Sequence, residues 1–354
     1  MNGHTAKWML AALALVVDFV PAIGAAAVPE PIDRPAIAVK RLEQATFLGV
    51  AAAGDRLVAV GERGLIALSD DKGGTWRQAK VPVSVSLTAV AFPTSMLGWA
   101  VGHYGVVLHS SDGGETWIKQ LDGIKVAQIV ADGVPTGDSS RRAERLVEEG
   151  PDKPFLDLFF PTQEEGFVVG AYGLMLRTTD GGKTWRSLTL DLPNPKASHL
   201  YAIRATGGAL YVAGEQGLAL RSDDAGVSFK QLVMPYGGSW FTLVADPVGA
   251  VVFAGLQGKA YSSVDRGATW QSVELPVPAT VTVAVRAPDG RVFMATQGGQ
   301  IVAYDAIKHR TVSLPLPPLP MPTGLWVATD GGLVATTLHG VQRLQLAPEN
   351  ANRR

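Results

Sequence analysis

The sequence has 354 residues, of which 47% are hydrophobic and 18% charged, and its formal net charge is −1. This near-neutral balance excludes the global positive field that draws proteins to nucleic acid or to an anionic membrane. The absence of cysteine excludes disulfides, thiolate metal sites, cysteine nucleophiles and lipid attachment through an N-terminal cysteine. The 40 glycines and 23 prolines favour many short strands joined by tight turns.

Residues 1–27 have the pattern of a secretory signal peptide. Lys7 precedes an apolar run at 8–20, and small residues follow at 25–27. The run is shorter than the roughly 20 residues of a spanning helix, and Asp18 interrupts it, so cleavage is expected and an uncleaved anchor is the alternative. We therefore expect an exported protein of the periplasm, peripheral to the inner membrane.

The rest of the chain repeats one unit. Successive marker glycines lie 41, 68, 44, 41, 40 and 42 residues apart, at Gly64, Gly105, Gly173, Gly217, Gly258, Gly298 and Gly340. Each unit alternates apolar with small or polar residues in four short runs, which is typical of antiparallel strands. Seven such units predict an all-β, seven-bladed β-propeller with four-stranded blades over residues 28–348, followed by a tail at 349–354.

Ring closure is predicted from the two ends of the repeat region. The last unit offers only three strands before the chain ends, and the alternating segment AIAVKRL at 36–42 precedes the first full unit. We expect residues 36–42 to add as the outer strand of the seventh blade, because closing a ring leaves only short, protected edges.

The long second interval contains an insertion at 122–155, before the third blade. Its stretch SSRRAERLVEEG reads as a short charged helix with Ser139 or Ser140 as cap and Gly150 as its end. A loop of this length is usually functional or disordered, so contact with a partner and a passive solvated flap both remain open. Its candidate contact residues are Arg141, Arg142 and Arg145.

A phrase of the form Ser/Thr-x-Asp-x-Gly-x-Thr-Trp recurs between the third and fourth strands of five units. Its aspartate can accept hydrogen bonds from the turn that follows, its glycine permits a positive φ, and its aromatic ring can pack on the neighbouring sheet. Five aspartates, one per blade, are too far apart to converge on one substrate or metal, so we interpret the phrase as structural. The aspartates are Asp71, Asp112, Asp180, Asp224 and Asp265, and the aromatics are Trp76, Trp117, Trp185, Phe229 and Trp270.

The turns between the second and third strands contain residues that differ from unit to unit. We expect them on the face opposite the repeated phrase, around the axial mouth, where aromatic and arginine side chains would suit a binding surface. The alternative for each residue alone is a solvated turn position. The candidate partner-binding residues are Arg63, His103, Tyr104, Tyr172, Glu215, Gln216, Gln257 and His339.

The tandem pattern G-W-A-V-G-x-x-G-x-[IV]-L-x-[ST]-x-D-G-G-x-T-W, at 98–117 and nearly complete at 166–185, resembles the photosystem II assembly/stability-factor family of BNR-type propellers with their Asp boxes. The resemblance covers roughly residues 45–345. It implies an exported scaffold without enzymatic activity or cofactor that binds membrane-protein subunits or a membrane complex during assembly. Because the sixth and seventh boxes are degenerate and the second interval is long, we expect the non-photosynthetic bacterial branch and a partner such as a transporter.

The rival interpretation is a sialidase-like glycoside hydrolase or a carbohydrate-binding propeller, since such proteins also carry Asp boxes. That hydrolysis needs several arginines, a tyrosine with its glutamate and an acid aspartate, and the arginine motif Phe/Tyr-Arg-Ile-Pro is absent. Tyr172 and Glu215 could supply half of such a site, whereas Arg63 is the only arginine among the candidate turn residues named above.

Overall fold

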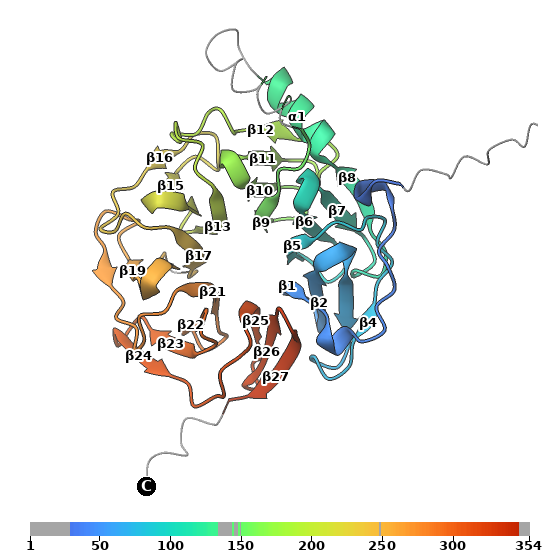
Figure 1. The fold of residues 1–354 in the computed structure, drawn as a ribbon. Coiled ribbons are helices and arrows are strands. Elements are labelled where there is room, and N and C mark those ends of the chain that lie inside the picture. The colour runs from blue at the N-terminus through green and yellow to red at the C-terminus, as the bar shows by residue number, and fades with distance from the viewer. Residues whose placement is uncertain (1–28, 134–143, 145–147, 149, 248, 347–354) are drawn as a thin grey trace, which may run out of the picture.

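A computed structural model describes residues 29–133, 144, 148, 150–247 and 249–346, in which seven antiparallel sheets surround one axis (Figure 1). The predicted seven-bladed propeller is confirmed. Within the described residues six blades have four strands and the last has three. Figure 1 looks along the axis and shows the first strand of each blade innermost.

The strands run from the axis outward in chain order within every blade. The first blade holds β1 (Phe47–Ala53), β2 (Arg56–Gly61), β3 (Ile66–Ser69) and β4 (Arg77–Gln78), and the second holds β5 (Leu87–Ala91), β6 (Gly98–Gly102), β7 (Val107–Ser110) and β8 (Ile118–Leu121). The third holds β9 (Phe155–Phe159), β10 (Gly166–Gly170), β11 (Met175–Thr178) and β12 (Arg186–Ser187), and the fourth holds β13 (Leu200–Thr206), β14 (Ala209–Gly214), β15 (Ala219–Ser222) and β16 (Lys230–Gln231).

The fifth blade holds β17 (Trp240–Ala245), β18 (Val251–Gly255), β19 (Ala260–Ser263) and β20 (Gln271–Ser272), and the sixth holds β21 (Val281–Arg286), β22 (Val292–Thr296), β23 (Ile301–Asp305) and β24 (Arg310–Ser313). The seventh has β25 (Pro322–Val327), β26 (Gly332–Thr337) and β27 (Gly340–Gln345).

The core lies between neighbouring sheets, because the second and third strands bury side chains on both faces. All residues of β6 and β10 are buried, for example. Trp99 of β6 stacks on Phe160, just after β9 of the next blade, with ring centroids 4.0 Å apart and planes 11° apart. Burying large rings between blades accounts for much of the cohesion of such a ring.

The prediction that residues 36–42 form the outer strand of the seventh blade is wrong. This segment is not a strand, and it runs along the first blade instead: the Ala36 amide donates to the Val81 carbonyl at 3.1 Å, and the Val39 amide to the Gln78 side chain at 2.9 Å. Ile32, in the short 3₁₀ helix η1 (Pro31–Asp33), is buried between the first two blades. The alternating apolar residues that suggested a strand are largely exposed, with Ile37 at 56% and Val39 at 36%.

The seventh and first blades meet by direct packing. The 3₁₀ helix η2 (Leu42–Gln44) lies against β27, and β1 lies against β25 and β26. The Thr46 hydroxyl donates to the Leu338 carbonyl at 3.1 Å, and the Thr323 hydroxyl to the Phe47 carbonyl at 2.8 Å. Side chains, rather than a shared sheet, thus join the two ends of the ring.

The insertion before the third blade is helical, as expected, but its described helix is α1 (Gly123–Asp132). Asp122 caps it, since its carboxylate accepts the Lys125 amide at 3.2 Å, and Val126 and Val130 bury one face. The stretch predicted to be a helix, 139–150, falls largely outside the described residues, as do Arg141, Arg142 and Arg145. In the described part of the chain, no helix has the length and apolar character needed to span a bilayer.

Candidate functional site

The ring has two faces, and we name each by its turns. The box face carries the turns that hold the repeated Asp phrase, together with the turns between first and second strands; the amide of Gly113 in one box turn donates to the Met96 carbonyl at 2.9 Å. The turn face carries the turns between second and third strands and the links between blades. The amide of His103 in such a turn donates to the Ser86 carbonyl of a link at 2.9 Å.

Each box turn satisfies its own polar groups. In the third blade one carboxylate oxygen of Asp180 accepts the Thr184 amide at 2.9 Å and the other accepts the Thr184 hydroxyl at 2.6 Å, while Thr178 donates to Asp180 at 2.9 Å. These hydrogen bonds to the ionised form lower the pKa of Asp180 to about 2. Gly182, at φ +80°, bonds Thr178 through its amide. The same set recurs at Asp71, Asp112, Asp224 and Asp265.

Ion pairs bridge neighbouring blades across the box face. Arg56 and Arg77 of the first blade pair with Glu115 of the second, the former at 2.9 Å. Asp223 of the fourth blade pairs with Arg266 of the fifth at 2.9 Å. Several charged groups of this face are therefore engaged with each other.

On the turn face, the turn between the second and third strands of a blade lies very close to the link that enters the same blade. A Cβ on Gly170 would lie 2.2 Å from the Pro154 carbonyl oxygen, and one on Gly61, Gly102 or Gly255 would make an equivalent contact at 2.1 Å. Only glycine fits there. The second residue of the turn is left-handed yet not glycine in five blades: Arg63, Tyr104, Tyr172, Gln216 and Gln257 have φ between 53° and 58°.

The structure separates the predicted turn residues into two groups. On the third to fifth blades, Tyr172, Gln216 and Gln257 each donate their amide to a residue in the link to the next blade, and Glu215 accepts the amide of the link residue His199. The others are exposed turn residues of the first, second and seventh blades, except Tyr104, which packs partly into the core between the first two blades. These are Arg63, His103, Tyr104 and His339.

His199, in the link to the fourth blade, connects Tyr172 with Glu215. Its Nδ1 accepts the Tyr172 amide at 3.1 Å, which requires an unprotonated Nδ1, and its ring meets the Tyr172 ring edge-on at 5.1 Å. The Glu215 carboxylate accepts the His199 amide at 3.2 Å. The Lys153 ammonium lies 5.8 Å from the Tyr172 ring centroid. Sequence reasoning found Tyr172 and Glu215 but not His199 or Lys153, which lie in links rather than in turns.

A cavity of about 280 Å³ lies on the axis, and different residues line it from those predicted. The expectation that the turn residues ring the mouth is wrong, because the innermost strands line it. Each of these strands is irregular at its second residue, where the register with its neighbour shifts. The residues at these irregularities are partly exposed and line the cavity; we call them the mouth ring: Leu48, Thr88, Leu156, Tyr201, Phe241, Thr282 and Thr323.

An aromatic row leads from the turn face to this cavity. His199 lies 6.2 Å from Tyr201, and Tyr201 lies 5.1 Å from Phe241, each pair edge-to-face between centroids. With Tyr172, four rings follow one another. Burial, with a contribution from the charge of Glu215, raises the pKa of Tyr201, so its hydroxyl remains protonated at neutral pH.

Two charged groups line the cavity, and they neutralise each other. Asp157 of β9 accepts the Ile203 amide at 2.9 Å and the Arg204 guanidinium at 2.5 Å. Thr242, two blades on, holds the Ala284 amide at 3.1 Å in the same way. Asp157 thus joins neighbouring blades, and among the described lining residues it has no second carboxylate beside it.

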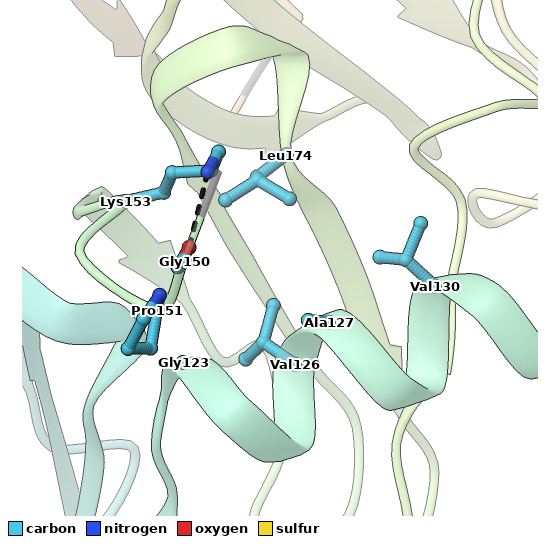
Figure 2. Close-up of a pocket in the computed structure, with 8 residues that line it drawn as sticks. All are labelled: Gly123, Val126, Ala127, Val130, Gly150, Pro151, Lys153 and Leu174. Atoms are coloured by element: carbon cyan, nitrogen blue, oxygen red, sulfur yellow. Dashed lines mark hydrogen bonds between the residues drawn. The ribbon is translucent and has the colours of Figure 1, made fainter. Parts of the chain in front are cut away.

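The insertion supports the turn face from outside. Figure 2 shows Val126 and Val130 of α1 directed towards Leu174, and Lys153 bonded to the Gly150 carbonyl at 3.1 Å. A Cβ on Gly123 would lie 1.9 Å from the Pro151 carbonyl oxygen, so the start of the helix sits tightly on the returning chain. The cavity between them is only about 10 Å³, roughly one water. Over the described residues no cluster of His, Asp and Glu could hold a metal.

Comparison with known proteins identifies relatives of one kind. Residues 140–310, just under half of the chain, match the family described as photosynthesis system II assembly factor YCF48. The photosystem II assembly lipoprotein Ycf48 of Prochlorococcus marinus is 42% identical over 65 residues, which cover 18% of this chain and 19% of that protein. The protein of the same name from Picosynechococcus is 27% identical over 145 residues, 39% of this chain and 34% of that protein. The aligned parts thus span about a third or less of these relatives.

Solved structures share the fold over most of the chain. A structure titled "YCF48 bound to D1 peptide" has a TM-score of 0.63 at 15% identity and covers 89% of this chain and 100% of that one. A streptogramin B lyase has a TM-score of 0.66 at 14% identity over 86% of this chain and 95% of that one, which shows the propeller alone. The family match covers blades three to six. Over these blades the chain is similar to the photosystem II assembly factor family.

Proposed function

We propose that this protein is an exported, non-catalytic scaffold whose turn face binds a segment of a membrane protein while a membrane complex is assembled. The proposed partner is a complex other than photosystem II, such as a transporter of the inner membrane, and the proposed compartment is the periplasm. The solved relative bound to a D1 peptide supports peptide binding by a propeller of this family.

One observation carries the proposal. The box face engages several of its charges in pairs between blades, whereas the turn face of the third to fifth blades exposes Tyr172, Gln216 and Gln257. Left-handed residues other than glycine occur on both faces, at Tyr172 and also at Lys72 in a box turn, so the exposed aromatic ring is what distinguishes the turn face. Tyr172 is 46% exposed, and exposed aromatic residues dominate contact surfaces.

Glycoside hydrolysis has weaker support. That reaction uses two carboxyl groups on either side of the bond to be broken. The axial cavity offers Asp157, already bonded to Ile203 and Arg204, and the group around Tyr172 offers Glu215 with one histidine and one lysine. Neither place combines a pair of carboxylates with several arginines.

The route to the membrane would differ from that of the named lipoproteins. Those relatives carry a lipoprotein name, but this sequence contains no cysteine to receive a lipid. We propose that the partner itself, rather than a covalent lipid, holds the protein at the membrane, with an uncleaved segment 1–27 as the alternative.

The test is affinity purification of the tagged full-length protein from detergent-solubilised membranes of its source organism. The wild-type protein should enrich one membrane complex, and the double variant Tyr172→Ala/Gln216→Ala should lose most of that enrichment. The matched control is Val227→Ala/Val264→Ala, which removes side chains 59% and 74% exposed on the box face of the fourth and fifth blades. Equal retention by both variants, or no enrichment by the wild type, would contradict the proposal.

A further inference from the structure

The mouth ring is a second feature of the turn face that the scaffold function does not yet explain. We infer that it is a peptide-recognition pocket: it receives one large uncharged side chain, aromatic or long aliphatic, of an extended partner segment that lies along the aromatic row. This inference deepens the proposed function and rests on it, because it names the part of the partner that is read.

The irregular strand starts are what create the pocket. A β-bulge leaves one residue unpaired and turns its side chain away from the regular alternation. Here the shift falls at the second residue of all seven innermost strands, so each blade contributes one partly exposed side chain at the same height. Sevenfold repetition of the same irregularity makes a ring of side chains around the axis.

The ring has two unlike halves. Its aromatic and aliphatic half is formed by Leu156, Tyr201 and Phe241 of the third to fifth blades, the blades that also carry the exposed turn residues. Its hydroxyl half is formed by Thr282 and Thr323 on the sixth and seventh blades and Thr88 on the second, with Leu48 of the first blade between Thr323 and Thr88. An occupant must therefore be apolar on one side and able to hydrogen-bond on the other.

The hydroxyl half presents acceptors rather than donors. Thr282 donates its proton to the Pro322 carbonyl at 2.9 Å, and Thr323 donates to the Phe47 carbonyl at 2.8 Å. Each hydroxyl has one proton and two lone pairs, and the Thr336 hydroxyl lies 3.2 Å from that of Thr323, so at least one lone pair on each remains for groups that enter the cavity. Peptide N–H groups are donors of the required kind.

Charge and size narrow the occupant further. The Asp157–Arg204 pair leaves the lining without net charge, so burying a charged side chain there would cost free energy without compensation. Ligand pockets for whole small molecules typically span about 300–1,000 Å³. A cavity of about 280 Å³ fits one large side chain and its adjoining main chain.

The row of rings that runs from the turn face into the pocket favours a chain molecule. Successive rings from Tyr172 through His199 and Tyr201 to Phe241 are 5.1, 6.2 and 5.1 Å apart. An extended peptide rises about 3.3 Å per residue, so the row accommodates several residues in line. A compact sugar or metabolite would contact only the rings at the inner end of the row.

The experiment selects peptides and maps where they lie. Random linear peptides displayed on phage are panned on the full-length protein, and the Kd of the selected peptides is measured by fluorescence anisotropy; a glycan array is probed in parallel. We expect the selected peptides to share an aromatic or long aliphatic residue. Phe241→Ala should raise Kd about tenfold or more, whereas Leu256→Ala, a 38% exposed residue of the same face outside the row, should change it less than about twofold.

Crosslinking keeps the test independent of variant stability. Because the chain has no cysteine, Leu156→Cys in the mouth ring and Val264→Cys on the box face each carry a single photo-crosslinker. Peptides should crosslink to the first and not to the second. Peptides that bind Phe241→Ala unchanged and crosslink elsewhere would overturn the pocket while leaving the scaffold standing. Glycans retained in place of peptides would also overturn it, and failure to capture either peptides or a membrane complex would overturn the proposed function itself.

Discussion

The box face and the turn face place similar residue types in opposite situations. On the box face, Trp117 is 4% exposed, donates its indole N–H to the Gly114 carbonyl at 2.9 Å and packs against the first blade. On the turn face, Tyr172 is 46% exposed and begins a row of rings that ends in a cavity. The first aromatic contributes to cohesion between blades, whereas the second remains available to a ligand.

This difference teaches which repeated features describe the fold and which describe the function. A box turn is complete within eight residues, so it can recur from blade to blade without reference to anything outside the ring. The mouth ring also repeats in backbone, but its side chains change from leucine and threonine to tyrosine and phenylalanine around the axis. A recognition surface needs this combination, in which the backbone repeats from blade to blade while the side chains differ.

The largest expected change in stability comes from replacing the aromatic residue of the box face by alanine, in comparison with the aromatic residue of the turn face. Trp117→Ala should lower the free energy of unfolding by about 3–5 kcal/mol, because a buried ring leaves a cavity between two blades. Tyr172→Ala should lower it by less than about 1 kcal/mol. Urea denaturation measures both, and binding of the selected peptides should follow the reverse order. Similar stability losses for the two variants would remove the contrast between the faces.

A smaller loss is expected where a turn touches its link. Gly170→Ala places a methyl group 2.2 Å from the Pro154 carbonyl oxygen, so the backbone must move, at a cost of about 1–3 kcal/mol. The matched control is Gly237→Ala, since a Cβ there meets no atom within 4 Å and its φ is not left-handed. Thermal unfolding of both variants is the measurement, and an unchanged Tm for Gly170→Ala would show that the close approach is not required.

Acidification should weaken the box face selectively. The pKa values of Asp71, Asp180 and Asp265 are lowered from 3.8 to about 2 by hydrogen bonds within their turns. Folded-state values below the unfolded ones mean that this stabilisation is complete above pH ~4 and disappears as the pH falls towards 2. Tm should decline through that range, and Asp180→Asn should decline less steeply than wild type. Asp55→Asn, outside the boxes, serves as the control and should retain the wild-type slope.

The smallest effect is expected from the ion pairs that cross the box face. Arg77→Ala should cost no more than about 1 kcal/mol, because exposed pairs gain little in water, and the loss should shrink as salt is added. A double-mutant cycle with Glu115→Ala measures the coupling. A coupling well above that value, or one insensitive to salt, would mean that the box face contributes more through charge than through packing.

The fold could be predicted because its determinants are local. Glycines around the second turn and the aspartate–glycine–aromatic phrase of five boxes recur at intervals of mostly about 41 residues, and both encode their turn within a few positions. The position of residues 36–42 could not, since alternating apolar letters do not specify a neighbour. In the structure Ile37 is 56% exposed and its carbonyl accepts the Gln78 side chain.

The candidate site was predicted only in part for a related reason. Tyr172 and Glu215 could be found because they lie between glycines at positions that differ from unit to unit. The residues of the mouth ring depend on the strand register, which a single sequence does not reveal. One missed signal was present: Asp122 followed by Val126 and Val130 is a helix cap with a buried stripe, so α1 was readable.

The three-stranded seventh blade has a consequence for how such a ring changes over evolutionary time. Because the first and last repeats share no sheet, gain or loss of a whole repeat at their junction would leave every other hydrogen-bonded ladder intact. The contacts between the two blades, namely the packing of η2 and β1 and the hydrogen bonds of the Thr46 and Thr323 hydroxyls, would need to be re-formed. The fold can therefore tolerate duplication of a single repeat in the gene. The number of blades in such a ring can change during evolution.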